Sequence, residues 1–139
     1  MRVALVGKDR AAVRTALEAE PGVELIGPPG AIAGPDGGEI PRLAAALRAF
    51  ESLFEAERVE RVVLTDASNL SLAALLVATK MLVPVGAVAT RSPGGEREDG
   101  RSSVNARLIE HLADAALADE AVTGWLREPQ QPSQAAAEH

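Results

Sequence analysis

One acidic residue, Asp66, stands where an α/β enzyme would place its chemistry. It ends the apolar run at residues 61–65 and precedes a helix start at Ser68 and Asn69. A carboxylate in that position can contact a ligand hydroxyl, hold a metal ion or act as a general base. The side chains of Ser68, Asn69 and Ser71, with the N–H groups of a helix N-terminus, can bind a phosphate. The same groups can instead cap backbone N–H groups, so both interpretations stay open.

Few other side chains could carry out nucleophilic, acid–base or metal chemistry. The chain has no cysteine, which excludes a disulfide framework, a thiolate nucleophile and a Cys-based zinc site. His111 lies in a helical pattern, where a partly exposed structural histidine is the simpler interpretation. The stretches VGKDR and GPPGAIAGPDGG match neither the phosphate-binding loop nor the dinucleotide-binding spacing. We therefore assign no catalytic residue and expect no metal and no cofactor.

Strand-like and helix-like patterns alternate along the chain. Short apolar runs bounded by turn residues predict strands, and apolar residues at a period of 3.6 predict helices. Asp9 is the expected N-cap of the first helix, and Ser68 or Asn69 that of the third. The polar stretch at residues 91–103 predicts a loop. The predicted strands are residues 2–6, 23–26, 61–65 and 85–89. The first predicted helix begins at Asp9 and stops at Pro21 and Gly22, and the other predicted helices cover residues 41–59, 68–82, 105–118 and 120–127.

This alternation predicts a Rossmann-like, doubly wound parallel sheet with helices on both faces, an α/β/α arrangement in one domain at residues 1–127. Residues 128–139 are predicted to form a frayed tail. In such sheets ligands bind beyond the carboxyl ends of the strands. The segments expected at that edge are residues 7–10, the glycine-rich loop after Ile26, residues 65–69 and residues 90–103.

The composition limits the partners of the chain. It has 139 residues, is 47% apolar and carries a net charge of -6, which argues against nonspecific binding to nucleic acids. The longest apolar run, residues 72–78, is too short to cross a membrane. The Met1 start leads directly into a strand pattern without a basic and apolar leader. We therefore expect a soluble cytoplasmic protein.

Three segments carry a resemblance to a known family. These segments are MRVALVG, VVLTDASNLSLAALLVATKMLVPVGAV and VNARLIEHLADAALADE. Together they resemble the N-terminal half of the non-hydrolysing UDP-N-acetylglucosamine 2-epimerases, sugar-nucleotide isomerases with a two-domain fold like that of the GT-B glycosyltransferases. The resemblance covers most of residues 1–127. It implies a UDP-sugar ligand, bound in the family between two halves of which this chain matches one.

The resemblance also indicates which functional groups the chain keeps. Asp66 matches the aspartate of the family's "GDT" turn, and Asn105 matches the asparagine of its "EANR" motif. Other charged or imidazole positions of the family fall on Asp9, Ala11, Ala87, Ala89, Ser103 and Ala106, and a proline of the family falls on Arg10. Because methyl and hydroxyl groups cannot transfer the protons that epimerisation needs, we expect no epimerase activity from this chain alone. The predicted ligand-binding residues are Arg10, Asp66, Ser68, Asn69 and Asn105.

Two further hypotheses remain. The opening segment also resembles a response-regulator receiver domain, in which Asp66 would correspond to the phosphorylated aspartate, although only Asp9 stands where receivers have an acidic pair. Alternatively, the chain is one half of a split epimerase or glycosyltransferase. The exposed edge of a half-fold leads us to expect either a homodimer or a subunit that supplies the complementary domain.

Overall fold

The computed structural model describes residues 1–30, 38–88 and 100–129. Five parallel strands in these residues form one sheet, in the order β2-β1-β3-β4-β5. The strands are β1 Arg2–Val6, β2 Glu24–Ile26, β3 Arg61–Leu64, β4 Val85–Val88 and β5 Ala115–Leu117. The helices are α1 Ala11–Ala19, α2 Glu39–Glu57, α3 Asn69–Lys80, α4 Gly100–Leu112 and α5 Val122–Arg127, with the 3₁₀ turn η1 Asp119–Ala121.

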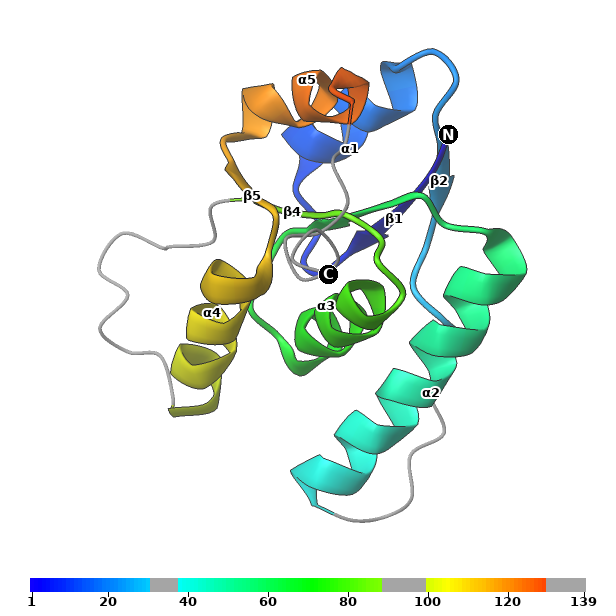
Figure 1. Cartoon of the computed structure of the whole chain (residues 1–139). Coiled ribbons are helices and arrows are strands. Elements are labelled where there is room, and N and C mark those ends of the chain that lie inside the picture. Colours follow the sequence, from blue (N-terminus) through cyan, green and yellow to red (C-terminus); the bar gives the residue numbers. More distant parts are fainter. Residues whose placement is uncertain (31–37, 89–99, 130–139) are drawn as a thin grey trace.

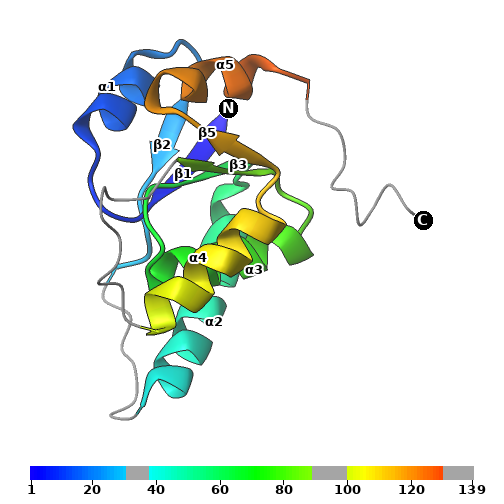
Figure 2. The same ribbon diagram turned by 90° about the vertical axis from the view of Figure 1, so that its left-hand side faces the viewer.

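The sheet is the middle of three layers. Helices α1 and α5 cover one face, and α2, α3 and α4 cover the other (Figure 1). The view at right angles separates the same layers (Figure 2). Two apolar clusters fill the interior, one on each side of the sheet. The predicted doubly wound α/β fold is therefore confirmed.

Burial on both faces explains why the central strands read as continuous apolar runs. Every residue of β4 is buried, as are the last three residues of β3. Helix α3 is apolar on most sides because it packs against the sheet, α2 and α4 together. The segment that looked most hydrophobic in the sequence is thus the innermost helix.

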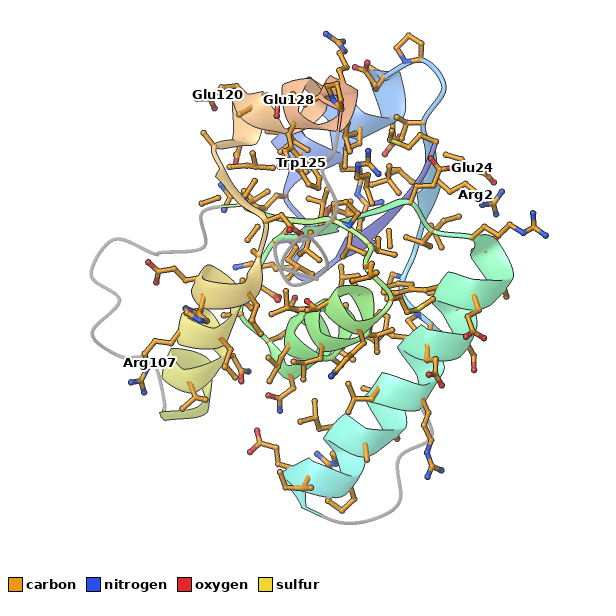
Figure 3. The ribbon with its side chains drawn as sticks, in the orientation of Figure 1. Arg2, Glu24, Arg107, Glu120, Trp125 and Glu128 are labelled. Atoms are coloured by element: carbon orange, nitrogen blue, oxygen red, sulfur yellow. The ribbon has the colours of Figure 1, made fainter. Side chains whose placement is uncertain are left out.

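The single tryptophan lies in the layer on the other side of the sheet. Trp125 projects from α5 toward the strands (Figure 3). It packs so closely over β4 that a Cβ on Gly86 would lie 3.0 Å from its ring and 2.7 Å from Leu117. Glycine is required there because the aromatic ring occupies the space of a side chain.

The prediction of a helix over residues 105–118 was wrong at both ends. Helix α4 begins at Gly100, inside the predicted loop, and stops at Leu112. The residues that follow form strand β5, because the backbone N–H of Asp114 donates to Val85 O and its carboxylate accepts the Val85 N–H, each at 2.8 Å. Ala116 of β5 is exposed, and Leu108 of α4 is 37% exposed.

Two other helix starts differ from prediction, and one agrees. Arg10 is the N-cap of α1, although its side chain makes no capping hydrogen bond, while Asp9 instead forms an ion pair with Arg14 at 2.8 Å. Helix α2 begins two residues before Pro41, which still lies in the first turn, where proline is tolerated. Ser68 caps α3 as predicted, accepting the Ser71 N–H at 3.2 Å.

The predicted edge loop at residues 90–103 and the predicted tail fall largely outside the described residues, as does much of the loop after Ile26. Within the described residues, no helix has both the length and the apolar character to span a bilayer.

Candidate functional site

The candidate site lies at the point where the strand order reverses. Chain connections lead from β1 outward to β2 on one side and onward through β3 to β5 on the other. In doubly wound sheets this switch point opens a crevice beyond the carboxyl ends of the two central strands. The loop at residues 7–10 follows β1, and Asp66 follows β3. Asp66 therefore lies at the predicted carboxyl edge of the sheet, where the two central strands β1 and β3 end.

The Asp66 carboxylate is a hydrogen-bond hub. Its Oδ1 accepts the Ser68 N–H at 3.1 Å, the Ser68 hydroxyl at 2.7 Å and the Ser71 hydroxyl at 2.6 Å. Its Oδ2 accepts the backbone N–H of Lys8 at 2.7 Å. A single side chain thus joins the end of β3 to the first turn of α3 and to the loop after β1.

These hydrogen bonds set the charge of Asp66. Partial burial alone raises the pKa of the carboxyl group, but the hydrogen bonds from Ser71, Ser68 and Lys8 together outweigh it and leave the pKa below its ordinary value of 3.8. The group is therefore a carboxylate throughout the neutral range. A general acid or base works best with a pKa near the operating pH, so this environment suits Asp66 to binding and positioning rather than to proton transfer.

Gly7 lets the loop after β1 approach the carboxylate. Its φ of +118° is accessible to glycine and strained for other residues. A Cβ at this position would lie 2.6 Å from Thr65 Oγ1 and 3.0 Å from Asp66 Cγ. The Thr65 hydroxyl also donates to Lys8 O at 2.6 Å. The tight turn and the two polar side chains hold the loop in one position.

A second network joins the first turns of α2 and α3 to the second turn of α4. Asn105 of α4 is buried, and its amide nitrogen donates to Ala67 O at 3.1 Å and to Asn69 Oδ1 at 2.8 Å. The amide nitrogen of Asn69 donates in turn to Glu39 Oε1 of α2 at 2.7 Å. Because Ala67 lies between Asp66 and Ser68, this amide network is continuous with the Asp66 hub.

The structure thus brings together four of the five residues predicted to bind ligand: Asp66 with Ser68, and Asn69 with Asn105. Arg10 is placed at the start of α1, where its Nη2 donates to Asp119 Oδ1 at 2.7 Å and ties α1 to η1. Ser71, which the sequence also offered beside Asp66, donates to the same carboxylate. The prediction missed Glu39, because its partner Asn69 lies 30 residues away.

The described residues offer no group of three or more His, Asp or Glu side chains placed to hold a metal ion. His111 is exposed on α4. What this edge presents is a fixed carboxylate, hydroxyl and amide groups, and the start of two helices. Such a set recognises hydroxyl-rich or anionic ligands.

Solved structures share this fold. The chain aligns with the UDP-GlcNAc 2-epimerase of Methanocaldococcus jannaschii in complex with UDP-GlcNAc and UDP, at a TM-score of 0.67 and 17% identity, over 93% of this chain and 44% of that one. The Neisseria meningitidis UDP-GlcNAc 2-epimerase bound to UDP-GlcNAc gives a TM-score of 0.66 and 15% identity, over 93% and 44%. The S. aureus MnaA–UDP structure gives 0.63 and 22%, over 84% and 37%.

The chain therefore has the fold of one part of the UDP-GlcNAc 2-epimerases. It spans less than half of the length of these structures. No protein-family model and no curated protein matches the sequence. The resemblance inferred from the three sequence segments is confirmed at the level of the fold.

Proposed function

We propose that the chain is a noncatalytic UDP-N-acetylglucosamine 2-epimerase-like domain that binds a nucleotide sugar at the carboxyl edge of its sheet. The main support is Asp66, a carboxylate at the switch point that accepts four hydrogen bonds and has a lowered pKa. A group held in this way shapes a binding loop, and it is poorly suited to donate or abstract a proton at neutral pH.

The surrounding residues support binding without catalysis. Ala87 of β4, at the position of a family histidine by the resemblance, presents a buried methyl group. No acidic or imidazole side chain of the described residues hydrogen-bonds to Asp66. Three structures of similar fold contain UDP or UDP-GlcNAc.

Within the proposed site the predicted residues have different roles. Asp66 and Asn105 fix the loops through their hydrogen bonds inside the protein. Ser68, Asn69 and Arg10 also hydrogen-bond inside the protein, and they are the proposed ligand contacts. The Ser68 hydroxyl and the Asn69 amide would meet sugar or phosphate oxygens, and the Arg10 guanidinium would meet the diphosphate.

Isothermal titration with UDP-GlcNAc tests the binding, and product analysis after prolonged incubation tests the absence of epimerisation. We expect weak binding that is competed by UDP, with no 2-epimer formed. Arg10→Ala and Ser68→Ala should each weaken binding, whereas Arg14→Ala, which removes a surface ion pair on the same helix, should not. Absence of binding in both the titration and a thermal-shift assay would refute the proposal, and turnover would refute its noncatalytic part.

A second candidate function, as one half of a larger assembly, is favoured by a specific observation. Each residue of the amide network has an exposed apolar neighbour in the sequence: Ile40 is 72% exposed, Val104 47% and Leu70 41%. Glu39, Asn69 and Asn105 are hydrogen-bonded in a row. Their three apolar neighbours therefore lie at the same end of the helical layer. Exposed apolar groups gathered at one end are typical of an interaction surface.

We propose a second copy of the chain as the partner at this end of the helical layer, and a separate complementary domain as the alternative. Sedimentation equilibrium distinguishes the two. A dimer that is weakened by Ile40→Glu or Leu70→Glu, and unchanged by Leu82→Glu at the other end of α3, supports self-association. A chain that is monomeric at all concentrations excludes the second copy and leaves a complementary domain as the occupant.

A further inference from the structure

A hollow of about 590 Å³ lies on the helical face at the end opposite Asp66. It is bounded by the middle of α2, the last turns of α3 and the end of α4. Its volume falls within the range of small-molecule sites. Helix α3 separates it from the candidate site, since the helix begins beside Asp66 and its 12 residues span roughly 18 Å.

The hollow has an apolar floor and a charged rim. Leu47, Leu76, Met81 and Leu112 supply most of the apolar floor. Leu76 and Met81 are only partly buried even though they pack against the core. A methionine in such a lining adapts to ligands of different shape. The floor would therefore accommodate an apolar group of the ligand.

The rim carries an excess of positive charge. Arg48 and Lys80 line it together with one acidic residue, Glu51, and all three are exposed. Neither cation makes a hydrogen bond or ion pair with another side chain of the described residues. Two cations without partners beside an apolar hollow are complementary to an anionic group attached to an apolar body.

The last carbonyl groups of α3 are capped, so they repel a nearby anion less than the free carbonyl groups of an uncapped helix end would. The carbonyls of Val77, Ala78 and Thr79 accept the N–H groups of the next residues beyond the helix, at 2.8–3.3 Å. This cap requires a left-handed residue, and Leu82 adopts it with a φ of +61°. A large residue is strained in this conformation, and strained backbone is often retained beside functional sites.

We propose that this hollow binds a small amphipathic anion, with the apolar body against Leu47, Leu76, Met81 and Leu112 and the anionic head at Arg48 and Lys80. The site is separate from the nucleotide-sugar edge, and the inference does not depend on the proposed function.

The test is an NMR titration of the ¹⁵N-labelled chain with decanoate, and with decyltrimethylammonium as a probe of similar apolar length and opposite charge. We expect decanoate to shift the amides of residues 47–51, 76–82 and 112, and the cationic probe to bind much more weakly. The double variant Arg48→Glu/Lys80→Glu should lower the affinity for decanoate about tenfold, since two favourable exposed charge contacts become repulsive.

The matched control is Arg42→Glu/Arg107→Glu, which makes the same change in net charge at exposed positions of α2 and α4 outside the hollow. Arg107 points away from the helical layer (Figure 3). This control should bind decanoate like the parent chain. The emission of Trp125, on the other face of the sheet, verifies that each variant is folded.

The inference is overturned if decanoate causes no shifts, if its shifts lie outside these residues, or if the cationic probe binds equally well. It is also overturned if Arg48→Glu/Lys80→Glu retains the parent affinity, or if a second copy of the chain is found to cover these residues in solution.

Discussion

Replacing Asp66 with asparagine separates the charge of the carboxylate from its shape. The amide oxygen of the introduced side chain would still accept from Ser68 and Ser71, but its NH₂ group would face the backbone N–H of Lys8, which now donates to Oδ2. One charge-assisted hydrogen bond is lost, and the bonds to the remaining oxygen become neutral. We therefore expect Asp66→Asn to fold with lower stability at neutral pH.

The magnitude follows from the geometry. Hydrogen bonds to charged groups contribute about 1.5–3 kcal/mol each, and neutral ones roughly half as much. Because Asp66 is only partly buried and Lys8 is exposed, water replaces some of the lost interaction. We expect the free energy of unfolding to fall by about 2 kcal/mol at pH 7. With a urea dependence of about 1–3 kcal/mol per molar, the unfolding midpoint should fall by roughly 1 M.

The pH dependence provides the sharper test. Since the pKa of Asp66 is lower in the folded than in the unfolded chain, its stabilisation is present above about pH 4 and is lost as the pH falls through the folded-state pKa. The difference between parent and Asp66→Asn should therefore shrink in strongly acidic solution. Other carboxyl groups titrate in both proteins, so their contributions cancel in this difference.

The assay is urea unfolding followed by Trp125 fluorescence at pH 7 and in strongly acidic buffer. Glu55→Gln on α2 is the control, because Glu55 is exposed and its side chain makes no hydrogen bond to another described residue. It should differ from the parent by less than about 0.5 kcal/mol. If Asp66→Asn is as stable as the parent at pH 7, or if the gap is the same at both pH values, the account of Asp66 as a charged hub is wrong.

Three further substitutions test the packing around the two sites. Leu82→Gly should raise the stability by about 0.5–1 kcal/mol in thermal unfolding, because it relieves the positive φ, whereas Leu82→Ala should give no gain. Gly86→Ala should lower stability by about 1–3 kcal/mol and shift the tryptophan emission, since its Cβ would meet Leu117 and Trp125. Gly124→Ala, with open space at its Cβ, is its control. Asn105→Ala should lower stability by about 1–3 kcal/mol in urea unfolding, because it leaves Ala67 O and Asn69 Oδ1 without their donor; Arg107→Ala on the same helix should have little effect.

The fold was predictable because the pattern of the buried strands is strong. The apolar runs of β1, β3 and β4 and the turn residues after them leave few alternatives to a parallel sheet. Strand β5 escaped prediction because Ala115 and Ala116 continue the spacing of the preceding helix, and alanine favours a helix more than a strand. What decides their conformation is the pairing of Asp114 with Val85, 29 residues away.

The candidate site was predictable only in part, for the same physical reason. Asp66 and Ser68 are close in sequence, so a strand end followed by a helix cap already places them together. The contact between Asn105 and Asn69 spans 36 residues, and the link to Glu39 spans 30. Asn105 was found only through the family resemblance. Residues brought together by the tertiary fold alone carry no local signal.

We propose that the Asp66 edge binds a nucleotide sugar without transforming it. The most direct measurement is an NMR titration of the ¹⁵N-labelled chain with UDP-GlcNAc, in which the sugar resonances are followed in the same tube. We expect amide shifts centred on residues 7–10, 66–69 and 105, with the sugar unchanged. Shifts that are absent up to millimolar ligand, that centre elsewhere on the chain, or that accompany epimerisation of the sugar would contradict it.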